Sequence, residues 1–473
     1  MSSHPLEEIL HPRSIAVVGA SAGGRGAGFL SPLVEFGFKG KLYPVNPKYP
    51  EIMGLKAYPT VRDIPDPVDF VISVVPAREV PKMLEDSAYK GAKGVHLFTA
   101  RFAETGRPQA AQLEQEILKM ARKLGIRLIG PNCMGVYYPA ERISFQDDFP
   151  KKSGTVALAS QSGNVAGEIV HAAALRGVYF SKAISYGNAI DLNESDYLEY
   201  FAQDPETKVI LMYVEGVKDG PRFFNMLRRV ASVKPVIVIK GGRGEAGARA
   251  TASHTASLAG SLRVWDAMVN QAGAIPVENL DELIDMATTF QFLPSPKGKR
   301  VGVAGGAGGA SVLAADQCEM AGLEVIPLPK EFREQLKNQG ISIWDWLSNP
   351  ADLSIREDDN FSVGQILEMM AQDPHFDLLI AIMGHMHRRF MGADITIDKY
   401  LNEQYSINTC RIKPLLAVVP DRSLGIDEWD SWEWKMNCEL RSELIARNIP
   451  FYPTIGQAAL SARKMIDYFR SKS

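Results

Sequence analysis

The stretch Gly154-Thr-Val-Ala-Leu-Ala-Ser-Gln-Ser-Gly-Asn164 has the clearest structural pattern in this sequence. An apolar run is followed at once by small and polar residues that can begin a helix. Residues 14–24 and 300–310 repeat this order of apolar strand, glycine-rich turn and helix. Continuously apolar strands are typical of parallel sheets that are covered on both faces. The three stretches therefore predict three α/β units.

Further apolar runs predict more strands in each unit, with helical patterns between them. These runs are residues 70–75, 95–98, 209–214, 236–239, 378–383 and 415–419. Connectors rich in proline and charge lie at residues 138–142, 149–153 and 293–299. We expect three doubly wound parallel-sheet domains, which span residues 1–140, 150–293 and 300–473.

Composition excludes several classes of function. The chain has 473 residues, of which 46% are hydrophobic, and a net charge of −3 gives no electrostatic basis for binding nucleic acid or an anionic membrane. No apolar run approaches the ~20 residues that cross a bilayer. The N-terminus lacks the apolar core of a signal peptide. The cysteines are Cys133, Cys318, Cys410 and Cys438. Their wide spacing disfavours both a zinc site and a disulfide framework. We expect a cytoplasmic protein.

Open parallel sheets bind ligands beyond the carboxyl ends of their strands, where helix N-termini present free N–H groups. In the first domain, Lys48 follows the second strand where a nicotinamide-binding protein would place an acidic residue for the ribose. A lysine suits a phosphorylated ribose instead, either that of coenzyme A or that of NADP. The candidate ligand-binding residues after the first and second strands are Gly19, Ala20, Ser21, Gly23, Asn46 and Lys48.

Later strands of the first domain would end at the same ligand-binding edge of the sheet. Their candidate residues are Val75, Pro76, Thr99, Asn132 and Cys133. Ordinary turn chemistry is the alternative interpretation, because proline and glycine are common in turns without binding anything.

Residues 240–260 contain no aromatic residue and one large aliphatic residue, Leu258. Such a segment cannot bury much apolar surface, so we expect a mobile loop. His254 lies within this segment, where its imidazole could act as a nucleophile that moves between sites. The alternative is an incidental histidine in a flexible loop.

These features together resemble the nucleoside-diphosphate-forming acyl-CoA synthetases, which include succinyl-CoA synthetase, and the α subunit of ADP-forming acetate–CoA ligase matches more closely. The resemblance implies a Rossmann-like CoA-binding domain followed by two flavodoxin-like ligase domains. The matching segments are Val18-Gly-Ala-Ser21, Asn46-Pro-Lys48, Gly130-Pro-Asn-Cys133, Ser160-Gln-Ser-Gly163, Tyr186-Gly-Asn188, Tyr213-Val-Glu-Gly216, Gly247-Ala-Arg-Ala-Thr-Ala-Ser-His254 and Asn349-Pro-Ala-Asp-Leu353.

The resemblance implies that His254 becomes phosphorylated and that Glu215 binds the second nitrogen of its ring. A carboxylate that accepts from Nδ1–H leaves Nε2 free to attack phosphorus. Glu215 could instead cap a neighbouring turn. The family is expected to bind the phosphoryl group between two helix N-termini. The corresponding residues here are Ser160, Gln161, Ser162, Gly163, Gly308 and Gly309.

The implied reaction converts an acyl-CoA, ADP and phosphate into an organic acid, CoA and ATP. The chain leaves no stretch for an ATP-grasp domain, so we expect a separate β subunit that binds ADP or ATP with Mg²⁺. Arg101 departs from the family, which commonly has glycine at this position, and either binds a substrate carboxylate or faces solvent. His385 and His387 have no carboxylate at ligand spacing, so we expect no metal site there.

Two other functions remain open on the sequence alone. An NADP-dependent oxidoreductase would use the first domain but would leave the segment around His254 without a use. A non-catalytic CoA-binding regulator would use the same fold, but it would not need Glu215 together with His254. No motif identifies the acyl substrate.

Overall fold

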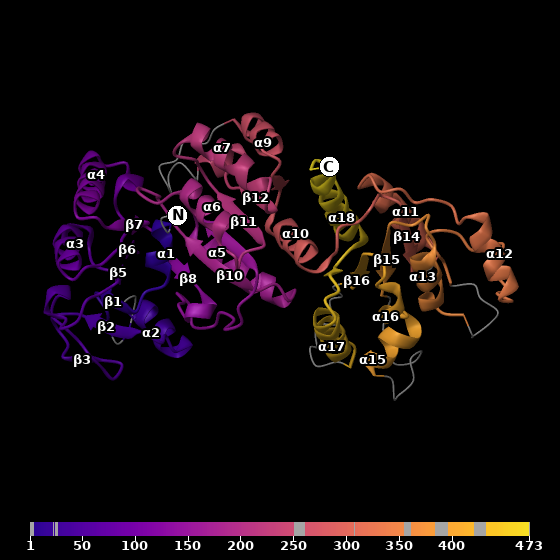
Figure 1. Ribbon diagram of the computed structural model, residues 1–473, viewed down its shortest axis with the longest axis horizontal. Coiled ribbons are helices and arrows are strands. Elements are labelled where there is room, and N and C mark those ends of the chain that lie inside the picture. The colour runs from indigo at the N-terminus through magenta and orange to yellow at the C-terminus, as the bar shows by residue number, and fades with distance from the viewer. Residues whose placement is uncertain are drawn as a thin grey trace. The chain divides into compact units, whose positions relative to one another are not determined.

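A computed structural model of the protein describes residues 4–21, 23, 27–249, 261–306, 308–353, 361–383, 396–420 and 432–472. The chain divides into two compact units, Met1–Leu283 and Ile284–Ser473. The first unit contains two large sheets with their helices, and the second unit contains one (Figure 1). Among the described residues, no helix is both long and apolar enough to cross a membrane.

The first sheet is parallel throughout and has the strand order β2-β1-β5-β6-β7. The chain reverses direction across the sheet between β1 and β5, which is where doubly wound sheets bind ligands. Its strands are β1 (Ser14–Val18), β2 (Lys41–Val45), β5 (Phe70–Ser73), β6 (Gly94–Leu97) and β7 (Arg127–Ile129). Its helices are α1 (Pro5–Leu10), α2 (Ala27–Phe36), α3 (Val80–Tyr89) and α4 (Pro108–Lys123). A short antiparallel pair, β3 (Glu51–Ile52) and β4 (Leu55–Lys56), follows β2.

The second sheet repeats this order in the direction β10-β9-β11-β12-β13 and adds one antiparallel strand, β8 (Gly135–Tyr137), beside β10. Strand β8 precedes residue 150, where we expect the second domain to begin. The second sheet therefore includes residues that the proline-rich connectors assign to the first domain. The parallel strands are β9 (Val156–Ser160), β10 (Phe180–Ser185), β11 (Val209–Val214), β12 (Val236–Lys240) and β13 (Ile275–Val277). The helices of this sheet are α5 (Gly163–Leu175), α6 (Glu194–Gln203), α7 (Gly220–Ala231) and α9 (Leu262–Gln271). Helix α10 (Leu280–Phe292) begins in the first unit and ends in the second, where Phe290 packs against the apolar core.

The sheet of the second unit has the order β14-β15-β16-β17. Arg300 and Glu324 form an isolated parallel bridge beside β14, in the place that a second strand occupies in the other two sheets. The strands are β14 (Val301–Ala304), β15 (Leu378–Ile382), β16 (Leu415–Val418) and β17 (Phe451–Tyr452). The helices are α11 (Gly309–Met320), α12 (Lys330–Asn338), α13 (Val363–Gln372), α15 (Ile397–Lys399), α16 (Ile407–Cys410), α17 (Trp432–Ala446) and α18 (Ile455–Arg470).

The apolar runs of the sequence correspond to buried strands. Every residue of β1, β9 and β14 is buried, as expected of parallel strands that are covered on both faces. The six further strands that apolar runs predict are all present, with ends that differ by one or two residues at most. The predicted α/β class with doubly wound parallel sheets is therefore confirmed.

The expectation of one loop over residues 240–260 is wrong in part. Lys240 is the last residue of β12, and residues 245–249 are helical. Alanine, glutamate and arginine in residues 245–249 favour a helix despite the glycine among them. His254, in residues 250–260, and His385 and His387, in residues 384–395, lie outside the described residues.

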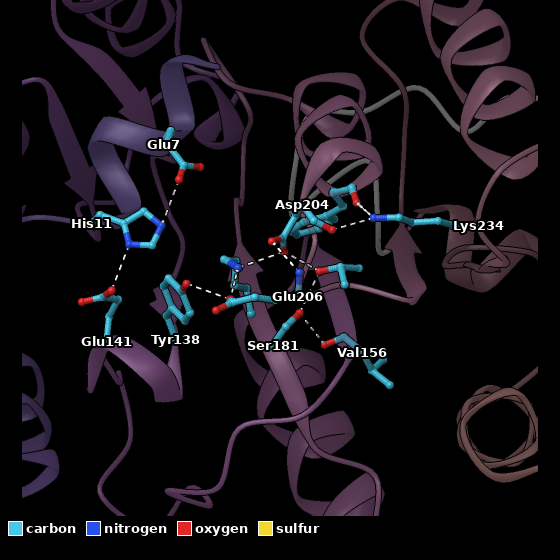
Figure 2. Close-up of polar contacts among 12 residues, drawn as sticks. Glu7, His11, Tyr138, Glu141, Val156, Ser181, Asp204, Glu206 and Lys234 are labelled. Carbon is cyan, nitrogen blue, oxygen red and sulfur yellow. Dashed lines mark hydrogen bonds and ion pairs between the residues drawn. The ribbon is translucent and has the colours of Figure 1, made fainter. Parts of the chain in front are cut away.

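A buried lysine stabilises the amino end of the second sheet. Lys182 Nζ lies 2.8 Å from Asp204 Oδ2 and 2.6 Å from Glu206 Oε2. The Tyr138 hydroxyl donates to Glu206, and Figure 2 shows Tyr138 and Lys234 reaching this cluster from opposite sides. Burial raises the pKa of Asp204, but hydrogen bonds from Lys182 and a neighbouring threonine outweigh burial and place this pKa below its ordinary value.

We expect Lys182→Met to lower the free energy of unfolding by about 3–5 kcal/mol, because the substitution leaves the buried Asp204 carboxylate without its counter-ion. Urea denaturation followed by circular dichroism measures the change. Arg229→Met is the matched control, since the Arg229–Glu199 pair is 61% and 31% exposed. This control should cost about 1 kcal/mol or less. Equal losses in the two variants would contradict the assignment.

The same pair gives a pH dependence with a defined sign. Because the folded state lowers the pKa of Asp204 from its ordinary value of 3.8, the stabilisation is complete above that value. It is lost as the pH falls through the lower, folded-state pKa. The difference in the free energy of unfolding between wild type and Lys182→Met should therefore become smaller only at acidic pH.

Candidate active site

Backbone hydrogen bonds join the carboxyl ends of the first two sheets. The N–H of Asn188 donates to Pro131 O at 3.0 Å, and the N–H of Ile190 donates to Gly130 O at 3.1 Å. These residues follow β10 of the second sheet and β7 of the first. The ligand-binding ends of two doubly wound sheets therefore adjoin, and both contain residues that the sequence analysis identifies as candidates.

The loop after β1 approaches the loop after β5 closely. Gly19 has a φ of +89°, and a Cβ atom there would lie 2.8 Å from Val74 Cγ2, so only glycine fits. Asn46 Nδ2 donates to Ala20 O at 2.7 Å, while its Oδ1 accepts from the Lys48 N–H at 3.0 Å. Asn46 thus connects two loops, and the exposed Lys48 side chain follows at the outer strand of the sheet.

Hydrogen bonds also connect the loops after β5, β6 and β7. The Thr99 hydroxyl donates to Val75 O at 2.7 Å, and the Asn132 N–H donates to Thr99 O at 3.0 Å. The structure therefore brings the predicted residues of five strands to one edge. The other predicted residues in these loops are Ser21, Gly23 and Pro76.

Cys133 does not present its side chain at this edge. Its thiol is 3% exposed and donates to Leu97 O at 3.7 Å. Burial raises the pKa of the Cys133 thiol, and burial also lowers the pKa of its neighbour His96 to about 4. Cys133 is among the predicted ligand-binding residues, but its side chain belongs to the core.

The second sheet presents a helix N-terminus at the shared edge. Helix α5 begins at Gly163, and the hydroxyl of its N-cap, Ser162, accepts from the Val165 N–H at 3.3 Å. The Ser160 hydroxyl donates to Ser162 O at 2.7 Å. A Cβ atom at position 163 would lie 2.4 Å from Met134 Cγ, so this helix start also requires glycine. The N-terminal dipole of α5 favours an anion here.

Glu215 follows β11 with a buried carboxylate. Gln161 Oε1 accepts from the N–H of Gly216 at 2.9 Å and from the N–H of Glu215. Glu215 is 6% exposed, and its Oε2 is buried without a hydrogen-bond partner among the described residues. Gln161, predicted as a phosphate ligand, therefore uses its side-chain oxygen to position Glu215. A buried carboxylate oxygen without a donor is costly unless another group supplies one.

Residues that the sequence analysis did not assign to the site surround Glu215. Lys240 Nζ donates to the carbonyl oxygens of Glu215, at 2.7 Å, and Gly241. Burial lowers the pKa of Lys240, and Glu215 partly opposes this effect. Burial and the Glu215 carboxylate raise the pKa of Tyr213 to about 12. The sequence signal for Lys240 is a lysine at the end of the otherwise apolar strand Val236–Lys240.

The second unit contains the other predicted helix N-terminus. Helix α11 begins at Gly309 after Gly308, which has a φ of +49°. However, the Gly308 N–H donates to Asp352 Oδ2 at 2.7 Å. This amide is therefore not free for a phosphate, and the Asp352 carboxylate would repel one. Among the described residues of either unit, no cluster of three histidine, cysteine or acidic side chains could hold a metal ion.

Two family models match parts of the chain. Residues 13–139 match a CoA binding domain, and residues 153–290 match a succinyl-CoA ligase like flavodoxin domain. The chain is 40% identical to subunit alpha of acetate–CoA ligase [ADP-forming] II from Pyrococcus furiosus, over 80% of this chain and 82% of that protein. It is 34% identical to 4-hydroxybutyrate–CoA ligase [ADP-forming] from Nitrosopumilus maritimus, over 97% of this chain and 64% of that protein.

A solved structure is similar over nearly the whole chain. It is the dinucleotide forming acetyl-coenzyme A synthetase 1 of Ca. Korarchaeum cryptofilum in complex with phosphate and ADP. The identity is 30%, the TM-score is 0.81, and the match covers 99% of this chain and 97% of that chain. By contrast, the chain spans only 49% of the acetate–CoA ligase [ADP-forming] of Methanocaldococcus jannaschii, at 40% identity over 74% of this chain.

We expect Gln161→Leu to lower the free energy of unfolding by about 2–4 kcal/mol, because two buried N–H groups lose their acceptor. Gln161→Glu should cost less in acid, where the introduced carboxyl is neutral and its carbonyl oxygen can accept both bonds. Chemical denaturation of the two variants measures the difference. A Gln161→Leu variant as stable as the wild type would show that this side chain does not fix the Glu215 turn.

Proposed function

This chain belongs to the family of ADP-forming acetate–CoA ligases, and we propose that it is the α subunit of an enzyme that converts an acyl-CoA, ADP and phosphate into an acid, CoA and ATP. The observation that carries this proposal is the Glu215 carboxylate, which is buried beside the N-terminus of α5 and has one oxygen without a donor among the described residues. The comparisons with CoA ligases support the same reaction class.

His254 supplies the missing donor in this proposal. Its Nδ1–H donates to Glu215 Oε2, which fixes the tautomer and leaves the lone pair of Nε2 free. Phosphate first attacks the carbonyl carbon of the acyl-CoA, and the C–S bond breaks to give an acyl phosphate and the CoA thiol. Nε2 then attacks phosphorus, and the organic acid leaves as its carboxylate. ADP finally accepts the phosphoryl group from Nε2.

The N-terminus of α5 stabilises the phosphoryl group during these steps. Its amides and dipole bind negative charge without supplying a water molecule for hydrolysis. The amides of the first turn of α5, which include that of Gly163, donate to this group.

CoA binds along the edge of the first sheet in this proposal. Lys48, exposed beyond β2, binds the 3′-phosphate of the ribose. The backbone amides of the loop that begins at Gly19 bind the diphosphate. The pantetheine arm then crosses β5 towards Thr99 and Asn132.

A second subunit completes the catalytic cycle. The Pyrococcus relative is named subunit alpha, and this chain covers most of that relative's length. This similarity supports a separate β subunit here. We assign to that subunit an ATP-grasp fold and the site for ADP or ATP with Mg²⁺. We place the reaction in the cytoplasm, because Cys133, Cys318 and Cys410 are buried free thiols, as suits a reducing compartment.

The phosphohistidine is tested by incubating the full chain with an acyl-CoA and radiolabelled phosphate. The wild type should acquire acid-labile, alkali-stable label, and His254→Ala should acquire none. Glu215→Gln should be labelled about 10²–10⁴-fold more slowly, because the imidazole loses its orienting carboxylate. Glu199→Gln, on the surface of α6, is the matched control. Label that persists in His254→Ala, or none in the wild type with its β subunit present, would refute the mechanism.

A further inference from the structure

Arg101 has a backbone conformation that favours glycine. Its φ is +79°, a value at which a Cβ atom is unfavourable. The Glu104 carboxylate accepts from the N–H groups of both Arg101 and Phe102, and it also accepts from Asn188 Nδ2 at 2.8 Å. The surrounding hydrogen bonds therefore impose the conformation. Strained residues of this kind concentrate at ligand-binding sites, where surrounding contacts maintain them.

Arg101 lies where the two sheets share their edge. Its loop follows β6, and Asn188, which binds that loop, follows β10 of the second sheet. In the strand order β2-β1-β5-β6-β7, the loop is three strand spacings, about 14 Å, from the strand that precedes Lys48. A CoA molecule whose ribose phosphate binds Lys48 can span this distance with its pantetheine arm. Its acyl end then reaches the region of Arg101.

The Arg101 guanidinium is not neutralised by the described residues around it. The side chain is exposed, and among the described residues it forms no ion pair or hydrogen bond. The two nearby carboxylates are bound by neutral donors: Glu104 by Asn188 and backbone amides, and Glu114 by the Ala103 N–H at 3.3 Å. A free guanidinium presents donors in a planar arrangement that matches a carboxylate.

We propose that Arg101 binds a second carboxylate on the acyl group, so that the acid activated by this enzyme is a dicarboxylic acid. This inference rests on the proposed function, since it places the acyl end of CoA at the edge shared by the two sheets. The phosphates of CoA and inorganic phosphate are the other sources of negative charge. In the proposed binding mode the CoA phosphates lie towards Lys48 and Gly19, on the far side of β5, and inorganic phosphate binds at the N-terminus of α5. We therefore assign the acyl carboxylate to Arg101.

The test is Arg101→Gly in the complete enzyme with its β subunit. Glycine removes the cation and also suits the positive φ, so the variant should unfold at a temperature no lower than that of the wild type. We expect kcat/KM for succinate, glutarate and adipate to fall about 10- to 100-fold, as for the loss of one charge-assisted contact. The kcat/KM for butyrate and the KM for CoA should not change.

Arg142→Gly is the matched control. Arg142 is exposed, has a φ of +58° and follows β8, so it lies at the opposite end of the second sheet. This variant should resemble Arg101→Gly in stability and the wild type in substrate selectivity.

The outcomes separate this inference from the proposed function. The role of Arg101 would be overturned if kcat/KM fell equally for butyrate and the dicarboxylic acids, or if it fell for neither. It would also be overturned if Arg101→Gly raised the KM for CoA but not the KM for dephospho-CoA. Failure of the wild type to form any acyl-CoA or to acquire histidine-linked label would instead count against the proposed function.

Discussion

The backbone hydrogen bonds between residues 128–131 and residues 188–192 place two ligand-binding edges side by side. They join the edge that carries the loops after β1, β5, β6 and β7 to the edge that carries the N-terminus of α5. Each doubly wound sheet offers binding sites only beyond its carboxyl edge. Two such edges that meet can therefore bind two ligands side by side. Main-chain bonds suit this purpose, because they do not depend on the identity of the side chains that line the site.

The apolar runs and glycine-rich turns of the sequence predict the strands of this architecture and the ends at which they bind ligands. Apolar runs identify the strands because buried parallel strands have no polar face, and the glycines of residues 154–164 identify a helix start that approaches other atoms closely. Gly19 and Thr99 can be assigned to one edge for the same reason, since parallel strands place their carboxyl ends together. These predictions depend on local pattern and on a general rule of topology.

The contacts around Glu215 could not be predicted in this way. Gln161 lies in a turn whose sequence is typical of phosphate binding, yet its side-chain oxygen accepts from backbone amides beyond β11. Asp352 reaches the amide of Gly308 from a loop distant in sequence. Lys240 belongs to an apolar strand but folds its ammonium group onto two carbonyl oxygens. Each contact depends on side-chain directions that only the assembled sheet defines.

Strand β8 has a consequence for how this protein can be divided and for how it folds. It comes from the end of the first domain and pairs antiparallel with β10, the last parallel strand on that side of the second sheet. A fragment cut at residue 150 would leave β10 as a bare edge, with a row of unpaired N–H and C=O groups available to another molecule. The N-terminal domain thus protects its neighbour from edge-to-edge aggregation. During synthesis, the protecting strand emerges from the ribosome before the strand that it covers.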